Sequence, residues 1–448
     1  MDKIIKTIIN IKEWIKMRTN KKRKKRIKPY AILLIIIVLL ILGLIIYKVL
    51  SNNNKIKLKI KEQETIETIK NHYQETVITN KETDLYDSEE NKIGKINESV
   101  IISLEDTNID INTKYFKIKD FEDTYIKYED VDPSEETITL DDRYLRYIPF
   151  NQNIKTKDKV SFYDKLDNYL YTINKSYEFT IIIKDNNRYG VEFNDRLLYI
   201  KNEDVENIYD NHNTDSLNSN GVAVLNYHFF YDENDPEDAK GCNETICHSK
   251  AQFKTHLDYF KENNIFTVTM DELEMYMDRK LQLPKSVLIT IDDGGRTKVG
   301  VDMLTEYKMN ATIFLVSSWY DPSTYYKTDY IELHSHSHNM HNGGKCPGGQ
   351  GAEIKCLPKE TILDDLAASR NALNNTRAFC YPFYEYNDYS MNLLKEAGFT
   401  MAFIGEVPTY YGYKLAEAGG DKFKIPRFVI MTHTTMKDID EYFNEIKN

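Results

Sequence analysis

The spacing of apolar positions divides this chain into parts of different character. An almost uninterrupted apolar run covers 30–50, and a polar stretch rich in Lys, Glu and Asn follows it to about residue 75. Short alternating apolar runs separated by Asn and Asp turns then continue to about residue 210, which is typical of small antiparallel β units. From residue 222, apolar strands alternate with helical segments, and this pattern predicts an α/β domain with a mostly parallel sheet.

In the α/β part, polar residues suited to chemistry follow the ends of predicted strands. The predicted strands are 222–227, 286–291, 311–316, 330–333, 377–381 and 400–404. The predicted helices include 250–263, 271–280, 298–307, 359–373 and 389–397. His228, Asp292, the histidines of 334–341 and the segment 382–384 all come just after strands. Because α/β barrels place their chemistry at the carboxyl ends of strands, this pattern predicts a site of that kind.

The β part contains an internal repeat. One copy opens with Leu-Tyr-Asp at 85–87 and closes with Tyr-Ile-Lys-Tyr-Glu-Asp-Val at 125–131, and the other runs from Phe-Tyr-Asp at 162–164 to Tyr-Ile-Lys-Asn-Glu-Asp-Val at 199–205. We therefore expect two small all-β modules, at 76–135 and 150–210. Each resembles a bacterial SH3-like module, and the resemblance implies binding to the cell wall. The alternative is a spacer that holds the next domain away from the membrane.

The charge pattern indicates a membrane boundary at the apolar run. Residues 1–28 carry twelve Lys or Arg against two acidic residues, a net charge near +10, whereas the rest stands near −21. The run is long enough to cross a hydrocarbon core of about 30 Å, and the basic residues before it place the N-terminus in the cytoplasm. We expect a cytoplasmic segment (1–28), a single transmembrane helix (29–50), a stalk (51–75) and an extracytoplasmic remainder, with no nucleic-acid partner. A cleaved signal peptide is the alternative, but no small-residue cleavage site follows the run.

Five cysteines fit an oxidising compartment. Cys242 and Cys247 lie close in sequence, as do Cys346 and Cys356, and both pairs are in loops that contain Gly or Asn. We expect two local disulfides and a free Cys380. Structural zinc at the first pair and the histidine after it is the alternative, although no fourth ligand is evident.

Two motifs of the α/β part carry candidate chemistry. Asp292 and Asp293 end an apolar strand and precede two glycines, and four of the ten histidines fall within 334–341. An aspartate with two imidazoles is a ligand set for a catalytic divalent metal that keeps one position open for water. The other aspartate is placed to take a proton from that water. We therefore expect a metal-dependent hydrolase, with zinc as the metal and cobalt, nickel and manganese as alternatives.

The order of these motifs resembles the polysaccharide deacetylases, which are also called carbohydrate esterase family 4 or the NodB-homology group. Thr-Ile-Asp-Asp-Gly at 290–294 is similar to the first motif of that family. Val-Leu-Asn-Tyr-His at 224–228 resembles the opening strand of a subgroup related to poly-N-acetylglucosamine deacetylases. The resemblance implies that Asp292 is the general base and that Asp293 is a metal ligand.

The same resemblance leaves two pairs of histidines as candidate ligands. The common second motif of the family, His-Ser/Thr-x-x-His, would select His334 and His338. The subgroup form, Glu-x-x-Ser-His-Ser/Thr-x-x-x-His, fits 332–341 without a gap and selects His336 and His341. We expect the second pair to bind the metal.

The third motif of the family resembles Phe-Cys-Tyr-Pro-Phe-Tyr at 379–384. The resemblance implies that the backbone N–H of Phe383 stabilises the oxyanion. Cys380 and Tyr384 depart from the pattern, because many members have an arginine and a glycine there. Arg427 is expected to replace the missing positive charge.

Two further roles have more than one candidate. Arg377 is a weaker alternative to the arginine expected beside the general base, because it lies at a predicted strand start. The histidine that protonates the leaving amine in the family has no clear counterpart, and His433 and His228 are the candidates. Without a general acid, hydrolysis would be slower by typically about 10²–10⁴-fold.

The expected fold class is α/β, with the transmembrane helix and the two SH3-like modules before the α/β domain. The family resemblance implies that this domain, 221–448, is a distorted (β/α) barrel. It implies removal of acetyl groups from N-acetylglucosamine units of a cell-envelope polysaccharide, with peptidoglycan as the first substrate and poly-N-acetylglucosamine as the second. The expected partners are this N-acetylated glycan, the cell wall and the membrane. A catalytically weak glycan-binding wall protein and an O-acetyl esterase are the rival functions.

Overall fold

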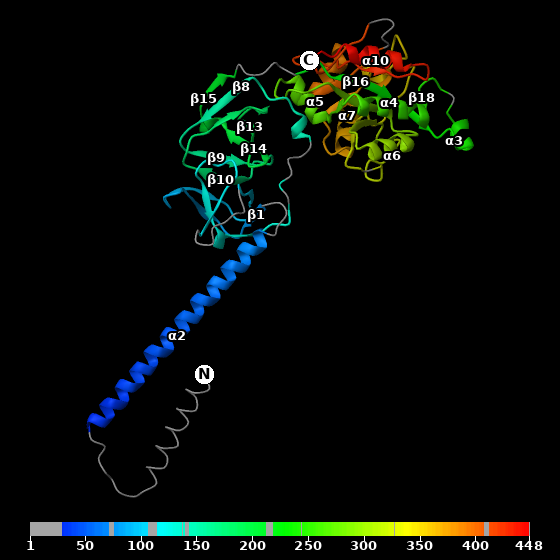
Figure 1. Ribbon diagram of the computed structural model, residues 1–448. Coiled ribbons are helices and arrows are strands. Elements are labelled where there is room, and N and C mark those ends of the chain that lie inside the picture. The colour runs from blue at the N-terminus through cyan, green and yellow to red at the C-terminus, as the bar shows by residue number, and fades with distance from the viewer. Residues whose placement is uncertain are drawn as a thin grey trace.

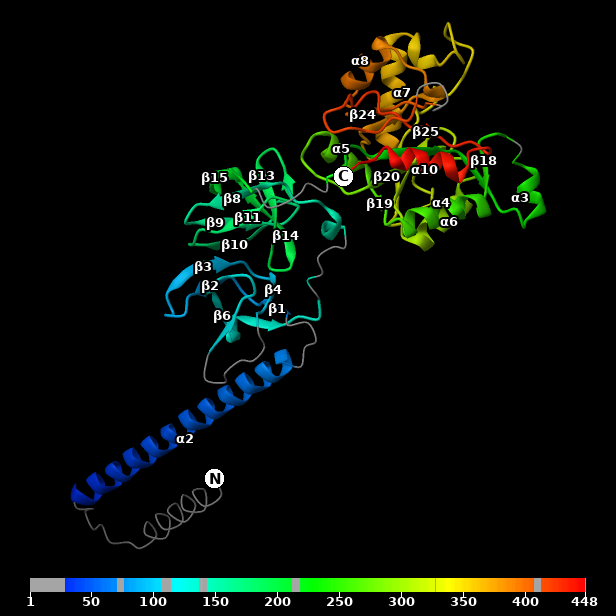
Figure 2. The same cartoon turned by 45° about the horizontal axis from the view of Figure 1, so that its top comes forward.

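The computed structural model describes residues 29–70, 76–105, 114–136, 138, 143–211, 218–242, 244–326, 328–406 and 412–447. Its first element is α2 (Pro29–Lys70), a long helix that extends away from the other elements (Figure 1, Figure 2). This helix covers the apolar run and continues through the polar stretch to residue 70. Within the described ranges, no helix is both long and apolar enough to cross a membrane. The transmembrane helix predicted at 29–50 was therefore not found, and the basic segment 1–28 lies outside the described residues.

Two β units follow α2 along the chain. The strands of the first are β1 (Thr76–Thr79), β2 (Thr83–Tyr86), β3 (Lys92–Ile96), β4 (Ile101–Ser103), β5 (Tyr115–Lys117), β6 (Tyr125–Lys127) and β7 (Val131–Pro133). The strands of the second are β8 (Gln152–Thr156), β9 (Val160–Tyr163), β10 (Tyr169–Ile173), β11 (Glu178–Thr180), β12 (Ile183–Lys184), β13 (Arg188–Phe193), β14 (Arg196–Lys201) and β15 (Val205–Asp210). The short helices η1 (Tyr128–Asp130) and η3 (Asn202–Asp204) lie at the same place in each unit, and η2 (Tyr144–Arg146) lies between the units.

The two units share one topology. A three-stranded sheet β4-β1-β7 in the first unit corresponds to β11-β8-β15 in the second. The opening aspartates are also equivalent, because Asp87 and Asp164 each accept a backbone N–H from the asparagine four residues later. The internal repeat is thus present in the structure, and β3 pairs with β10, so that both units contribute to one nine-stranded sheet. That these units are SH3-like modules stays a prediction.

The α/β part is built on an eight-stranded sheet in the order β24-β23-β22-β21-β20-β16-β25, with β19 beside β20. Its strands are β16 (Ala223–Tyr227), β19 (Phe266–Thr267), β20 (Ser286–Asp293), β21 (Ala311–Leu315), β22 (Ile331–Ser335), β23 (Ala378–Cys380), β24 (Met401–Phe403) and β25 (Phe428–Val429). All of its pairings are parallel. Isolated parallel bridges, Phe403 with Ile425 and Glu406 with Phe428, link the two outer strands. The sheet is thus consistent with the expected distorted barrel.

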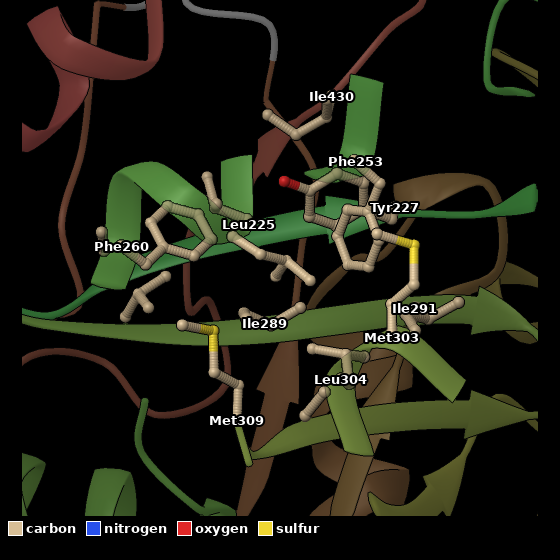
Figure 3. Close-up of a cluster of buried hydrophobic side chains, with 14 of the residues drawn as sticks. Leu225, Tyr227, Phe253, Phe260, Ile289, Ile291, Met303, Leu304, Met309 and Ile430 are labelled. Carbon is tan, nitrogen blue, oxygen red and sulfur yellow. The ribbon is translucent and has the colours of Figure 1, made fainter. Parts of the chain in front are cut away.

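Helices cover this sheet. Among the described residues they are α4 (Lys250–Glu262), α5 (Met270–Met277), α6 (Lys298–Tyr307), α7 (Lys359–Ala372), α8 (Asp388–Glu396) and α10 (Met436–Asn444), whereas the short α3 (Pro236–Lys240) lies at the periphery, beyond β18 (Figure 2). Two short parallel strands, β17 (Phe229–Tyr231) and β18 (Cys247–Ser249), and the short helices η4 (Glu353–Lys355) and η5 (Pro382–Tyr384) complete the domain. Figure 3 shows one part of the core, where Phe253 and Phe260 of α4 pack on Leu225 of β16 and Ile289 of β20. Seven of the eight residues of β20 are buried, as expected for a strand covered on both faces.

The expected disulfides are both present, Cys242–Cys247 and Cys346–Cys356, and Cys380 is free and buried. The zinc alternative for the first pair is therefore wrong, because its thiols bind each other.

Candidate metal centre and active site

The side chains predicted to carry the chemistry meet at the carboxyl ends of the parallel strands. Asp292 and Asp293 are the last residues of β20, and His336 directly follows β22. These strands are brought together by β21, which pairs with both in the same direction. Tyr381 and Pro382 follow β23, the strand beside β22. Parallel pairing therefore assembles residues that are far apart in the sequence.

Asp293, His336 and His341 form a candidate metal site. Oδ1 of Asp293 lies 3.3 Å from Nε2 of His336 and 3.2 Å from Nε2 of His341. The three ligand atoms lie within 4.8 Å of one another. Ligand atoms held about 2.1 Å from a tetrahedral ion are roughly 3.4 Å apart, so this spacing fits a zinc-like cation. The residue types and the geometry therefore both suit a divalent metal.

Hydrogen bonds aim the ligands at this point. Nδ1–H of His336 donates to the carbonyl oxygen of Cys380 at 2.9 Å, which leaves its Nε2 to face Asp293. Asp293 has a φ of 71°, in the left-handed region, and this turns its side chain at the end of β20. Burial by itself would raise the pKa of Asp293, but the hydrogen bonds from the two histidines hold that pKa well below its ordinary value. Asp293 is thus an ionised carboxylate, as a metal ligand must be.

The other two histidines of 334–341 contact different partners. Nδ1 of His334 lies 2.7 Å from Oγ1 of Thr376, and burial lowers the pKa of His334 to about 3. Nδ1 of His338 lies 3.0 Å from Oγ of Ser317. Of the two candidate pairs, the structure brings His336 and His341 to Asp293 and directs the rings of His334 and His338 to hydroxyl groups.

Asp292, the residue before Asp293, is held by a buried arginine. Nη1 and Nη2 of Arg427 donate to its two carboxylate oxygens at 2.7 and 2.8 Å, and the two side chains are 0% and 1% exposed. Nη2 of Arg427 also lies 2.9 Å from Sγ of Cys380, at the position where the related family has an arginine. The weaker candidate, Arg377, instead makes ion pairs with Asp271 and Glu274 of α5.

This ion pair determines the protonation state of Asp292. Burial alone would raise the pKa of the carboxyl, but the charge of Arg427, aided by His336, lowers it below its ordinary value. Asp292 is therefore ionised at neutral pH and has no proton of its own to lose. A carboxylate in this state beside the candidate metal ligands is equipped to accept a proton from water.

Comparison with known proteins identifies similar sequences for the α/β part of the chain. Residues 280–402 match the polysaccharide deacetylase family. The poly-β-1,6-N-acetyl-D-glucosamine N-deacetylase of Staphylococcus aureus strain MRSA252 is 25% identical over 247 residues, which cover 47% of this chain and 79% of that protein. The segment 280–402 is therefore part of a polysaccharide deacetylase domain. The corresponding enzyme of strain N315 has the same identity and coverage.

Solved structures give likenesses of lower identity. A de-N-acetylase from Aggregatibacter actinomycetemcomitans has a TM-score of 0.41 and 22% identity, with coverage of 49% of this chain and 99% of that chain. IcaB from Ammonifex degensii has a TM-score of 0.41 and 19% identity, with coverage of 50% and 97%. The assignment rests on the family match and the sequence relatives. The chain is thus an enzyme, a polysaccharide N-deacetylase that hydrolyses carbon–nitrogen bonds other than peptide bonds.

The deacetylase domain has an unusual turn in its third motif. Phe383 and Tyr384 of η5 have φ values of 56° and 63°, in the left-handed region that favours glycine. The turn therefore keeps a glycine-like backbone although the family glycine is replaced by Tyr384. The ring of Tyr384 packs on Gly405, where an added Cβ would lie only 2.5 Å from the ring. Gly405 thus provides the space that the tyrosine side chain requires.

The Tyr384 hydroxyl connects this turn to the strand that opens the domain. It donates to Oδ1 of Asn226 at 2.9 Å and lies 3.3 Å from Nε2 of His228. His228 is buried, and burial lowers its pKa below the ordinary value. Its Nδ1 has no hydrogen-bond partner among the described residues. The other candidate acid, His433, is exposed in the turn before α10.

The sequence analysis did not foresee the roles of Asn226 and Tyr384 in this network. Asn226 was visible only as part of the Leu-Asn-Tyr-His run, and Tyr384 only as a departure from the family pattern. Their contact joins β16 to the turn after β23, and the two are 158 residues apart. A polar residue in an otherwise apolar buried strand was the one available signal, because such a residue needs a partner.

Proposed function

We propose that this chain is a metal-dependent N-deacetylase of a polymer of N-acetylglucosamine, with poly-β-1,6-N-acetylglucosamine as the first candidate substrate. The single observation that carries the proposal is the arrangement of Asp293, His336 and His341 around one point, with the Arg427-bound Asp292 beside them. In this proposal the Asp293 carboxylate would bind the metal and the Asp292 carboxylate would accept a proton. Zinc is the metal we propose, because two imidazoles and a carboxylate suit it.

The residues of the chain would act as follows. A divalent cation held by the three ligands would supply Lewis-acid activation of water. Asp292 would accept a proton from the water that attacks the acetamide carbonyl, and Arg427 would keep Asp292 ionised and correctly oriented until then. A bidentate guanidinium contact restricts the carboxylate to one plane, so the accepting oxygen is fixed before substrate arrives.

The tetrahedral intermediate requires a hydrogen-bond donor for its oxyanion. We propose the backbone N–H of Phe383, which lies in the first turn of η5, where amides have no acceptor within the helix. The ring of Phe383 lies 4.6 Å from the ring of His341, so this amide belongs to a turn that touches a metal ligand. The positive φ of Phe383 is a strained conformation of the kind that clusters at functional sites.

For protonation of the leaving amine we propose His228. It follows β16 at the same end of the sheet as the metal ligands, and its Nε2 lies near the Tyr384 hydroxyl. Asp292 and Asp293 act on its pKa in the direction that favours the charged ring, against the effect of burial. His433 has no comparable contact with the site residues in the part of the chain that the structure describes.

The substrate is proposed from the relatives. Their printed activity concerns poly-β-1,6-N-acetyl-D-glucosamine. The sequence analysis placed peptidoglycan first, but nothing in the comparisons specifically supports peptidoglycan, so we reverse that order. We also propose that the domain works outside the cytoplasm, because two disulfides persist in oxidising compartments. Attachment to the membrane and binding of the cell wall by the repeats stay predictions.

Acetate release tests the proposed function directly. The full-length chain is loaded with zinc and incubated with a β-1,6-linked N-acetylglucosamine oligomer, and separately with peptidoglycan. We expect acetate from the oligomer, loss of release after chelation, and recovery when zinc is restored. Asp292→Asn should reduce release by a factor on the order of 10² or more, since general-base help contributes about 10²–10⁴-fold.

The control is Asp302→Asn, which changes an exposed carboxylate on α6 and should leave release unchanged. Acetate released only from O-acetylated glycans would support the esterase alternative instead. Binding of glycan by the zinc-loaded protein without acetate from any substrate would show a glycan-binding protein. Either result would contradict the proposal.

A further inference from the structure

Exposed aromatic side chains gather in one loop beside the metal site. Trp319, Tyr320 and Tyr326 follow β21 and are 50%, 36% and 42% exposed. The ring of Trp319 lies 5.1 Å from the ring of His341, in an edge-on contact. Half of the Trp319 surface is thus open to solvent, next to the proposed metal ligand His341. A core-packing role does not account for this exposure, because packing would cover the ring.

The loop that carries Trp319 is attached to the histidine-rich turn by its backbone. Ser317 N–H donates to the carbonyl oxygen of Ser337 at 3.2 Å, and Ser318 N–H donates to that of His338 at 3.0 Å. Oγ of Ser317 also lies 3.0 Å from Nδ1 of His338. His338 therefore has a structural role, which is to hold this loop, and that role does not involve the metal. They hold the loop in place, so Trp319 is an exposed ring on a fixed support.

Tyr320 extends the aromatic surface from His341 toward Asp293, another proposed metal ligand. Its ring lies against the backbone that follows Asp293: an added Cβ at Gly294 would be 3.1 Å from the ring, and one at Gly295 would be 3.0 Å from the hydroxyl. The carbonyl of Gly294 accepts a hydrogen bond from the Tyr325 hydroxyl at 2.6 Å. Trp319 and Tyr320 thus lie next to His341 and next to the Asp293 turn, respectively.

We propose that Trp319, with Tyr320 beside it, is a binding platform for a pyranose ring of the glycan chain adjacent to the sugar that loses its acetyl group. The proposal rests on the proposed function and adds a substrate-binding site to it. The faces of pyranose rings that carry axial C–H groups are apolar, and an indole ring offers a large apolar face with a polar N–H at its edge. The predicted ligand is therefore an oligomer that reaches beyond the reacting unit, rather than free N-acetylglucosamine.

The chain offers a direct spectroscopic test, because its only tryptophans are Trp14 and Trp319. In the full-length Trp14→Phe/Asp292→Asn protein, loaded with zinc, the tryptophan emission reports Trp319 alone and the substrate is consumed on the order of 10²-fold more slowly. We expect a saturable change in emission with a β-1,6-linked N-acetylglucosamine tetramer and little change with the monomer at equal sugar concentration. If calorimetry shows that the tetramer binds while the emission does not change, the platform is wrong.

Kinetics separate binding from a purely structural role. For Trp319→Ala we expect the ratio of kcat/KM for the tetramer to kcat/KM for 4-nitrophenyl acetate to fall about tenfold, mainly through KM, which corresponds to about 1.4 kcal/mol. Trp319→Tyr should restore most of that ratio. An equal loss on both substrates, or a loss of zinc, would show that Trp319 only supports His341 and would overturn the proposal.

A matched control uses an exposed aromatic residue elsewhere in the domain. Tyr389 on α8 is 38% exposed, and its hydroxyl donates to the carbonyl oxygen of Leu357. Tyr389→Ala should leave the ratio of the two kcat/KM values unchanged. If the wild-type protein releases no acetate from any N-acetylated glycan, the proposed function fails, whereas release with an unchanged ratio in Trp319→Ala refutes the platform alone.

Discussion

Replacing Arg427 by methionine should strongly destabilise the deacetylase domain. The guanidinium and the Asp292 carboxylate are 0% and 1% exposed and are joined by two hydrogen bonds of 2.7 and 2.8 Å. Methionine has a similar length but no charge, so Asp292 would be left buried without a counter-ion. Removing one partner of such a pair costs about 3–5 kcal/mol of unfolding free energy, because the remaining charge has lost both its partner and water.

The assay is urea unfolding of the full-length protein followed by Trp319 emission in the Trp14→Phe background. Arg427→Met should lower the unfolding free energy by about 3–5 kcal/mol, and Asp292→Asn added to it should recover a large part of the loss, since no charge is then stranded. Arg377→Met is the control, because that arginine is 40% exposed and its ion pairs contribute about 1 kcal/mol or less. A loss below about 1 kcal/mol for Arg427→Met would refute this account of the ion pair.

The pH dependence should change sign in the same variant. In the wild type, burial opposes ionisation of Asp292 but Arg427 outweighs it, so the folded pKa is below the unfolded value of about 3.9. This pair therefore stabilises the protein above about pH 4 and loses that effect as the pH falls through the folded pKa. In Arg427→Met, burial acts without Arg427 and raises the folded pKa. The variant should then lose stability as the pH rises from about 4 toward 7, and a slope equal to that of the wild type would contradict the reasoning.

Three further results are expected. His336→Ala should reduce bound zinc, measured by elemental analysis, by more than about tenfold, because His336 is one of the three proposed ligands, whereas His334→Gln should keep it. Equal zinc in both variants would contradict the ligand assignment. Tyr384→Phe removes the hydroxyl that joins the third motif to β16. This change should lower the unfolding free energy by about 0.5–1.5 kcal/mol and reduce kcat for acetate release. Unchanged values would show that the hydroxyl is dispensable. Replacing Cys346 and Cys356 together by alanine opens the loop that this disulfide closes, whose ends are separated by 10 residues in sequence. The free energy of unfolding, measured in urea, should fall by about 2.5–3 kcal/mol. No loss would show that other contacts hold the loop.

Much of the fold followed from local patterns. The predicted strands at 286–291 and 311–316 correspond to β20 and β21, and the predicted helix at 298–307 has the bounds of α6. These elements were predictable because each has a continuous apolar run or a regular period of its own. The sequence analysis did not predict α10 (Met436–Asn444), which is short, and whose apolar residues gain their meaning only by packing on the core cluster of Figure 3.

The join between the two repeats was also outside the reach of the sequence. The repeats were visible as similar segments, but the pairing of β3 with β10 depends on which edge strands lie next to each other in space. Edge strands carry unpaired backbone groups that any strand can satisfy, so their partner is chosen by geometry and not by side-chain identity. The polar stretch after the apolar run, which was predicted as a stalk, is helical as far as Lys70, where α2 ends.

By itself, the sequence determined which residue types stand at the ends of the barrel strands, and thereby the class of reaction. Motif spacing named Asp292, Asp293 and the histidine cluster, because neighbours along a strand exit stay neighbours in space. Only the tertiary structure decided which two imidazoles face Asp293, because the hydrogen bond from His336 to Cys380 of β23 fixes that ring and the backbone after β22 turns at Ser337, which has a φ of 77°. It also decided that Arg427 reaches Asp292 across 135 residues of chain, a contact that exists only because parallel strands bring β20 and β25 to the same sheet.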